Sequence, residues 1–384
     1  MIFIDTPEAF AEASARILEA PWVAIDTEAD SLHHYAEKLC LLQISIPGED
    51  FVIDPLATLE LKPLFSALSS KDLLLHAADG DIRLIKKTLP FSPHKVFDTM
   101  IAAQVLGYEK IGLQSLAEKH CDVKLSKAEQ KADWAERPLA EKLIRYAAND
   151  THYLRTIADA MKAELVELGR LEWHRQLCAK LLETLETLPA RGGSASGGKP
   201  VEDNSATAWQ IKGSKTMKGK EITILKELWF WRDALARRKD RPAFKILNSD
   251  YLLEISKWAA ANPGVDVDQW KEAPRNVRGE HRQALNALLA KAQTLPQAVL
   301  ELPERTFPRK RWSDRESKIF TELKTVRDKY AGELKIQPSL IATNAVLEAL
   351  SIEKPKELSV LKEKGMLAWQ IELAGRDLLE KLAS

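Results

Sequence analysis

The most informative segment of the sequence is WVAIDTEADS, Trp22 to Ser31. Its apolar run, Trp22 to Ile25, is typical of a buried strand and leads directly into Asp26 and Glu28. Residues i and i+2 of a strand point to the same face, so the two carboxylates project together. Burying such a pair is costly unless a cation lies between the charges, and hard cations such as Mg²⁺ bind carboxylate oxygens. Two ordinary surface acids are the alternative interpretation.

The segments that follow predict the rest of the first domain. Residues 39–46 (LCLLQISI) and 50–55 (DFVIDP) are β-rich, and residues 72–78 (DLLLHAA) form another short apolar run. Helical patterns cover residues 81–89, 98–106, 113–120 and 139–173. Three early strands in a meander, followed by alternating helices and short strands, predict an α/β domain around a mixed sheet, ending near residue 190.

The second half of the chain predicts helices only. Residues 190–200 (ARGGSASGGKP) read as a flexible linker, and apolar residues recur at helical spacing beyond it. Residues 231–255 and 326–350 share one rhythm: a charged helix, a short Pro-containing loop, and a polar cap before an apolar helix. We therefore expect a multidomain chain with a first domain at 1–190, a linker at 191–215, a helical domain at 216–298 and a second, diverged copy at 299–384.

Composition excludes several classes of protein. The chain has no apolar run near the roughly 18 to 20 residues of a membrane span, and its N-terminus is not a signal peptide. Cys40, Cys121 and Cys178 lie far apart and outside any CxxC pair, so neither a disulfide framework nor a zinc site is indicated. A cytoplasmic protein is expected. No coiled-coil pattern is evident, so we expect a monomer.

The net charge of zero hides an asymmetry along the chain. Residues 1–170 carry 19 basic and 27 acidic residues, a balance of −8. Residues 205–312 carry 21 basic and 12 acidic residues, a balance of +9. Bound cations would suit the first region and a polyanion the second. Solvated helix faces of arbitrary sign are the alternative explanation.

Two further acids accompany Asp26 and Glu28. Asp81 follows the apolar run at 72–78 and opens an apolar helix, where an N-cap is the ordinary role of an aspartate and Asp79 is the rival position. Tyr146 and Asp150 are four residues apart on a strong helical pattern, so they share one helix face. An exposed polar stripe is the alternative for this second pair.

The order of these segments resembles a known superfamily. IDTE, HAADGDI and YAANDTHYL are similar to the three exonuclease motifs of the DEDD superfamily, and the Tyr four residues before the last Asp is typical of its tyrosine-bearing branch. Residues 125–154 (LSKAEQKADWAERPLAEKLIRYAANDTHYL), together with LCLLQIS and FDTMIAAQVLGY, resemble the ribonuclease D family in particular. This resemblance covers about residues 1–170. Residues 222–255 resemble the helical HRDC module, of which that family typically carries two.

The resemblance implies a ribonuclease H-like domain that hydrolyses RNA from its 3′ end and releases nucleoside 5′-monophosphates. It implies two divalent ions, Mg²⁺ with Mn²⁺ as a substitute, held by Asp26, Glu28, Asp81 and Asp150. Tyr146 would orient the attacking water. The implied substrate is RNA with a single-stranded 3′ end, tRNA precursors above all. A DNA exonuclease and an inactive RNA-binding scaffold are the alternatives.

The basic region predicts where RNA phosphates are held. Arg237, Arg238, Lys239 and Arg241 form a cationic cluster that we expect to contact the RNA backbone. The neighbouring Trp229 and Trp231 have the spacing of core residues rather than of stacking platforms. The later segment PRKRW, residues 308–312, is either a further contact or a basic linker.

Five other residues have competing interpretations. His76 favours a structural, hydrogen-bonded role, and Asp98 favours a helix N-cap. Gln43 is equally compatible with a buried and a substrate-facing amide. Trp134 and Arg137 lie close to the last motif and serve either the RNA 3′ end or the packing of their own loop.

Overall fold

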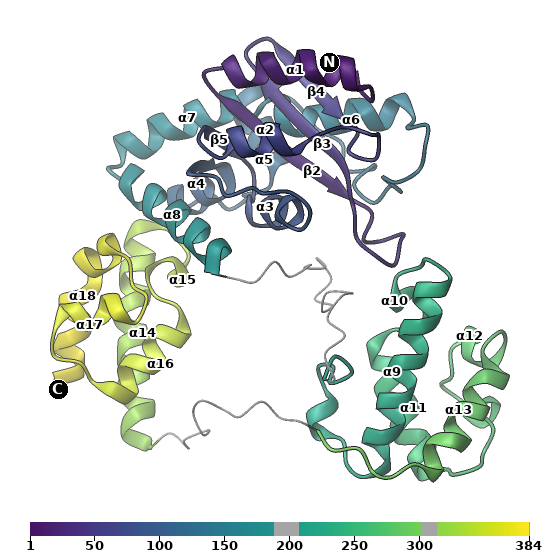
Figure 1. Ribbon diagram of the computed structural model, residues 1–384. Coiled ribbons are helices and arrows are strands. Elements are labelled where there is room, and N and C mark those ends of the chain that lie inside the picture. Colours follow the sequence, from purple (N-terminus) through teal and green to yellow (C-terminus); the bar gives the residue numbers. More distant parts are fainter. Residues whose placement is uncertain (188–206, 301–312, 384) are drawn as a thin grey trace. The chain divides into compact units, whose positions relative to one another are not determined.

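The computed structural model describes residues 1–187, 207–300 and 313–383. The first domain is built on a six-stranded sheet of order β1-β4-β3-β2-β5-β6 (Figure 1). β2, β3 and β4 form the predicted antiparallel meander, while β1, β5 and β6 pair in parallel with their neighbours. The predicted mixed sheet is confirmed. The strands are β1 (Ile2–Ile4), β2 (Val23–Ala29), β3 (Leu39–Ile46), β4 (Glu49–Ile53), β5 (Asp72–Leu75) and β6 (Lys95–Asp98).

Helices cover both faces of this sheet. Side chains of α1, α2, α3 and α8 pack on one face, against Val23 and Ile25 of β2. On the other face α6 contacts β2, β3 and β4. There α7 contacts β5, and α4 and α5 pack against α7. The helices are α1 (Pro7–Glu19), α2 (Lys62–Leu68), α3 (Asp79–Lys86), α4 (Thr99–Leu106), α5 (Leu113–Cys121), α6 (Glu141–His152), α7 (Leu154–Glu167) and α8 (Leu171–Thr187).

Asp98 organises the link between two helices of this domain. Its carboxylate caps α4 by accepting hydrogen bonds from the backbone N–H groups of Met100 (2.8 Å) and Ile101 (3.2 Å), which confirms the predicted N-cap. It also accepts from the backbone N–H groups of Ala77 (3.1 Å) and Ala78 (2.8 Å). Ala77 has a φ of 60°, in the left-handed region, which is energetically unfavourable for a residue with a Cβ atom. The buried Asp98 thus holds the turn from which α3 starts.

Residues 207–300 form a separate compact helical unit together with residues 30–38. Trp209 is 2% exposed and packs in its core, and Trp229 and Trp231 lie half-buried against that core. The interpretation of the last two as core residues is therefore confirmed. The elements are η1 (Ser214–Thr216), α9 (Lys220–Arg238), α10 (Ala243–Ile246), α11 (Ser249–Ala261), η2 (Val267–Gln269), α12 (Arg275–Arg278) and α13 (Arg282–Thr294).

Residues 313–383 repeat the local structure of α9 to α11 at a constant offset of 95 residues. The buried Arg232 donates to the carbonyl oxygen of Leu247 (3.1 Å), and the buried Arg327 donates to the carbonyl oxygen of Ala342 (3.3 Å). The similarity expected from the sequence is thus present in three dimensions. The elements are α14 (Asp314–Leu334), α15 (Pro338–Ile341), α16 (Asn344–Glu353), α17 (Leu358–Glu363) and α18 (Ala368–Ala383).

The second repeat packs against the first domain within one compact unit. The indole rings of Trp173 (α8) and Trp369 (α18) stack with their centroids 4.4 Å apart. Arg170 donates to the carbonyl oxygens of Val105 (2.9 Å) and Leu334 (3.1 Å). The stacking of the two indole rings and the hydrogen bonds from Arg170 to the two carbonyl oxygens stabilise this contact.

The expected linker at 190–200 and the basic segment at 308–312 lie outside the described residues. Among the described helices, none has the length and apolar character that a membrane span requires. The domain boundaries proposed from the sequence stay predictions.

Candidate active site

Three of the predicted acids come together over one face of the sheet. Asp26 and Glu28 extend from the end of β2, and Asp150 comes from α6, which lies over β2. One carboxylate oxygen from each of the three lies within 4.8 Å of the others. Asp150 is buried, while Asp26 and Glu28 are half-buried. The shared orientation predicted for Asp26 and Glu28 is therefore what the strand provides.

Asp81 approaches these acids from α3, which packs on the opposite face of the sheet. Its Oδ1 accepts a hydrogen bond of 2.5 Å from the hydroxyl of Thr27, the residue between Asp26 and Glu28. Asp81 lies inside the first turn of α3 and does not cap it, because the N-cap residue is Ala78. The rival Asp79 is half-exposed and forms an ion pair with Arg83 at 2.9 Å. Asp81, and not Asp79, is thus the acid of α3 beside the cluster.

Burial and neighbouring charges raise the pKa values of all four carboxylates. Burial raises the pKa of Asp26 well above its usual range, and the charges of Asp81, Asp150 and Glu28 raise it further. The pKa of Glu28 is likewise raised by burial and then by Asp150 and Asp81. Burial raises the pKa of Asp81 to about 7 against the opposing hydrogen bonds from Thr27, and burial followed by Asp81 raises that of Asp150 to about 7. Without a cation, these acids therefore retain protons near neutral pH.

The chemistry of this donor set fits divalent cations. Carboxylate oxygens are the ligands that hard cations prefer, and their positive charge would keep clustered acids ionised. Among the residues that the structure describes, this is the one group of three or more potential metal ligands found close together. Asp26, Glu28 and Asp150 therefore form a donor set that suits a divalent cation.

Tyr146 lies on α6 one turn before Asp150 and is 9% exposed. Its ring packs beside that of Trp134, with the centroids 5.9 Å apart. Burial raises the pKa of its phenol, and the charges of Asp150, Glu28 and Asp26 raise it further. Tyr146 and Asp150 are thus buried beside the acids, and the alternative of an exposed polar stripe is wrong. The phenol keeps its proton at neutral pH.

Other residues near the motifs have structural roles. The ring nitrogen Nδ1 of His76 lies 2.9 Å from the hydroxyl of Thr99, as the structural interpretation predicts. Arg137 donates to both carboxylate oxygens of Asp54 (2.6 and 2.7 Å) and to the carbonyl of Cys40 (3.0 Å). Trp134 is 1% exposed. Packing of their own loop is therefore the role the structure supports for Trp134 and Arg137.

The four predicted RNA-binding cations differ in how far their charges are already paired. Arg237 donates to the hydroxyl of Tyr35 (3.2 Å), and Lys239 forms an ion pair with Glu280. Arg238 and Arg241 are exposed. RNA binding by this cluster stays a prediction, and the geometry favours Arg238 and Arg241 over the other two.

Sequence reasoning missed two positioning residues. The sequence assigns no role to Thr27, yet its hydroxyl donates a hydrogen bond to Asp81, 54 residues away. Asp98 was predicted as a helix cap, and its hydrogen bonds to Ala77 and Ala78 were not predicted. Both contacts join residues that are far apart in the sequence, so no local pattern indicates them.

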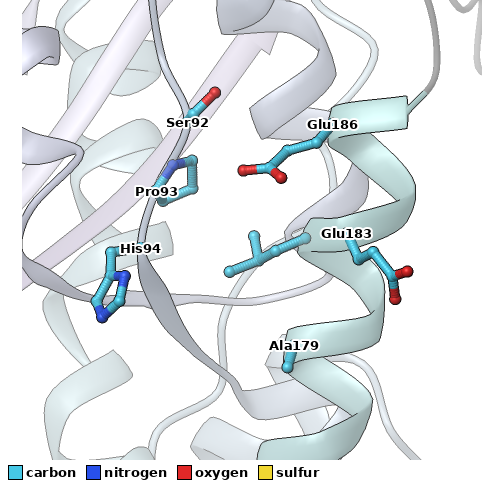
Figure 2. A pocket seen from close by; sticks show the side chains of 7 residues that line it. Ser92, Pro93, His94, Ala179, Glu183 and Glu186 are labelled. Atoms are coloured by element: carbon cyan, nitrogen blue, oxygen red, sulfur yellow. The ribbon is translucent and has the colours of Figure 1, made fainter.

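A pocket of about 330 Å³ lies elsewhere on the first domain, between α8 and the segment before β6. Figure 2 shows the carboxylate of Glu186 pointing toward Pro93, while that of Glu183 points away from the pocket. None of the predicted catalytic residues lines it. This pocket is therefore distinct from the acidic site.

The whole chain is similar to proteins of known family. Residues 1–166 match the family described as 3′-5′ exonuclease, and residues 221–264 and 316–382 match the HRDC domain. Ribonuclease D of Sphingobium indicum is 30% identical over 384 residues, covering 98% of this chain and 93% of that protein. Exosome complex component 10 of Homo sapiens is 29% identical over 77% of this chain and 33% of its own length.

Solved structures agree on the fold. Escherichia coli RNase D, described as an exoribonuclease involved in structured RNA processing, superposes with a TM-score of 0.66. The comparison covers 100% of this chain and 98% of that one at 24% identity. Together with the motifs at Asp26–Glu28, Asp81 and Tyr146–Asp150, these similarities establish that the chain is a 3′-5′ exoribonuclease of the ribonuclease D family.

Proposed function

We propose that this enzyme trims the 3′ ends of structured RNA, such as tRNA precursors, and releases nucleoside 5′-monophosphates. The observation that carries the proposal is the convergence of Asp26, Glu28 and Asp150 within 4.8 Å, with Tyr146 one helical turn before Asp150. The similarity to ribonuclease D over nearly the full length of both proteins supports RNA as the polymer.

Asp26, Glu28, Asp81 and Asp150 would hold two divalent ions, Mg²⁺ with Mn²⁺ as a substitute. When bound, such ions lower the pKa of an attacking water and offset the charge that develops on the phosphate and the leaving 3′ oxygen. The acids supply the matching negative charge from two sides: Asp26, Glu28 and Asp150 share one face of the sheet, and Asp81 reaches the strand end from α3. The hydrogen bond from Thr27 to Oδ1 ties the carboxylate of Asp81 to the strand that carries Asp26 and Glu28.

Tyr146 would orient the attacking water through its hydroxyl. Its phenol keeps its proton because burial and the neighbouring acids raise its pKa, so it acts as a hydrogen-bonding group and not as a base. The contact with Trp134 holds the ring in place. The position of the hydroxyl, rather than its acidity, is therefore the property that matters.

The helical regions would hold the body of the RNA while its single-stranded 3′ tail reaches the acids. We assign residues 1–190 to the exonuclease domain, 191–215 to a linker, and 216–298 and 299–384 to two HRDC-like domains. The balance of +9 over residues 205–312 and the exposed Arg238 and Arg241 support phosphate binding there. We further propose a monomeric enzyme that acts in the cytoplasm.

Digestion of end-labelled polymers tests this function. RNA and matched DNA labelled at the 3′ or the 5′ end would be incubated with Mg²⁺ or with chelator, beside the Asp26→Ala variant. Metal-dependent release of monophosphates from the RNA 3′ end, lost in the variant, is the expected result. Preferential cleavage of DNA would show that DNA, and not RNA, is the substrate. Binding of RNA without cleavage would show that the protein is an RNA-binding scaffold.

A further inference from the structure

Gln43 of β3 lies directly opposite Asp26 of β2 in the antiparallel register. Side chains of such a pair share one face of the sheet, with Cβ atoms about 4.5 to 5.5 Å apart. The neighbouring Leu42 and Ile44 pack in the core under the opposite face. The hydroxyl of Ser45, two residues after Gln43, lies 2.8 Å from the hydroxyl of Thr151 on α6. Gln43 therefore faces α6, on the side that carries Asp150.

The amide of Gln43 is 0% exposed, and neither its oxygen nor its nitrogen has a hydrogen-bond partner among the described residues. Most buried polar atoms in proteins are hydrogen-bonded, and an unpaired amide costs free energy. A methionine would fill the same space without that cost. The unpaired amide at this position therefore requires an explanation beyond packing.

The neighbours of Gln43 narrow the choice of partner. On β4 the directly opposed residue is Val52, which offers no polar side-chain atom. On the same strand, the hydroxyl of Ser45 is already engaged with Asp50 (2.6 Å) and Thr151. Of the two residues paired with Gln43 across the sheet, Asp26 is the one with a side-chain hydrogen-bond acceptor. The full burial of Gln43 rules out direct contact with RNA.

We propose that Gln43 is a positioning residue of the metal centre. Its amide N–H group donates a hydrogen bond to the carboxylate of Asp26 when that carboxylate is turned to hold a metal ion. This inference rests on the proposed function, because it requires Asp26 to hold a metal ion. Partners of this kind orient metal ligands and strengthen metal binding. Gln43 acts through Asp26 and touches neither the substrate nor the reacting atoms.

Three variants of the full-length chain test this role. Gln43→Met removes the amide and keeps the length and unbranched shape of the side chain. Gln43→Glu replaces the donor by an acceptor of the same shape. Leu42→Met is the matched control, since it changes the same strand on the opposite face of the sheet. Calorimetric titration with Mn²⁺ measures metal binding directly, thermal unfolding in chelator measures the fold, and kinetics on an oligoribonucleotide separate kcat from KM.

We expect Gln43→Met to weaken Mn²⁺ binding by about 10- to 100-fold, the range for such partners of metal ligands. It should lower kcat and leave KM for the RNA within about twofold, because no RNA contact is lost. In chelator it should melt at the wild-type temperature or above, because the unpaired amide is gone. Gln43→Glu should bind Mn²⁺ no better than Gln43→Met, and Leu42→Met should bind it like the wild type.

Unchanged Mn²⁺ binding by Gln43→Met would overturn the role of Gln43. A melting temperature for Gln43→Met well below that of Leu42→Met would also overturn it, because the amide would then have a structural partner. Asp26→Ala in the same titration tests the metal centre itself. Equal binding by Asp26→Ala and the wild type would overturn the proposed function together with the role of Gln43, whereas failure of the Gln43 variants alone leaves the metal centre intact.

Discussion

The hydroxyl of Thr27 donates a hydrogen bond of 2.5 Å to Oδ1 of Asp81. Thr27 alternates with Asp26 and Glu28 along β2, so its side chain points to the opposite face, where α3 packs. The bond joins the first and second acidic segments across 54 residues of chain. One strand end thereby places two acids on one side of the sheet and holds a third acid from the other side.

Asp81→Asn should lower RNA hydrolysis by about 100- to 1,000-fold, the range for losing one group that stabilises transition-state charge. Asp79→Asn, only two residues away, should leave the rate unchanged, because Asp79 is paired with Arg83 at the surface. Rates at saturating Mg²⁺ on one oligoribonucleotide measure both effects. Equal losses in the two variants would contradict the assignment of Asp81.

Tyr146→Phe should lower kcat by about 100-fold, in the range for a single group that handles a reacting water. Binding of RNA and of Mn²⁺ should change by less than about twofold, because the ring and its contact with Trp134 remain. Single-turnover kinetics and titration of the variant separate the two quantities. Weakened RNA binding with normal turnover would contradict the role of the hydroxyl.

The metal-free protein should become less stable as the pH rises from about 4 to above 7. Asp81 and Asp150 have pKa values of about 7 in the folded protein and ordinary values near 3.8 when unfolded, so the folded form binds more protons in this window. Their contribution is fully present below pH 4 and is lost as the pH passes 7. Calorimetric melting in chelator at pH 5, 6 and 7.5 measures this slope.

Asp150→Asn is the control for this pH dependence, and its slope should be shallower because one of the titrating groups is gone. Saturating Mn²⁺ should restore wild-type stability at pH 7.5 and have little effect at pH 5, because bound cations replace protons on the acids. A wild-type melting temperature in chelator that falls between pH 5 and pH 7.5 no more than that of Asp150→Asn would contradict the raised pKa values.

Arg238→Ala should weaken RNA binding more than Lys239→Ala does. The guanidinium of Arg238 is exposed, whereas the ammonium of Lys239 is paired with Glu280. The logarithm of the affinity for single-stranded RNA falls linearly with the logarithm of the salt concentration. Loss of one phosphate contact reduces the steepness of this line by about 0.7. Fluorescence anisotropy over a salt series, in chelator to prevent cleavage, measures affinity and slope. An identical slope in the wild type and Arg238→Ala would show that this residue contacts no phosphate.

Arg232→Met and Arg327→Met should each destabilise their own helical repeat by about 1 to 3 kcal/mol, the cost of leaving a buried partner unsatisfied. Arg232 holds the carbonyl of Leu247, and Arg327 holds the carbonyl of Ala342 and the side chain of Asn344. Hydrogen exchange followed by mass spectrometry locates the effect. We expect faster exchange only in residues 207–300 of the first variant and only in residues 313–383 of the second. The reverse pattern would refute the equivalent roles of the two arginines.

Local patterns in the sequence predict much of this fold. The apolar runs at 22–25, 39–46 and 50–55 indicate the meander, and Asp98 before an apolar helix indicates its cap. β1 and β6 have three and four residues, too few to show a periodicity, whereas the equally short β5 is indicated by the apolar run at 72–78. The helical repeat is visible because the rhythm of residues 231–255 recurs 95 positions later, with Arg232 and Arg327 at equivalent positions.

Backbone periodicity in the sequence places Asp26 and Glu28 on one strand face and Tyr146 and Asp150 on one helix face, and the resemblance to the DEDD motifs adds the expected chemistry. The choice between Asp79 and Asp81 follows from the folded structure, as do the unpartnered amide of Gln43 opposite Asp26 and the ion pair of Lys239 with Glu280. These relationships depend on packing between segments far apart in the chain. Strand pairing and helix docking create them, and no local periodicity records which side chains meet.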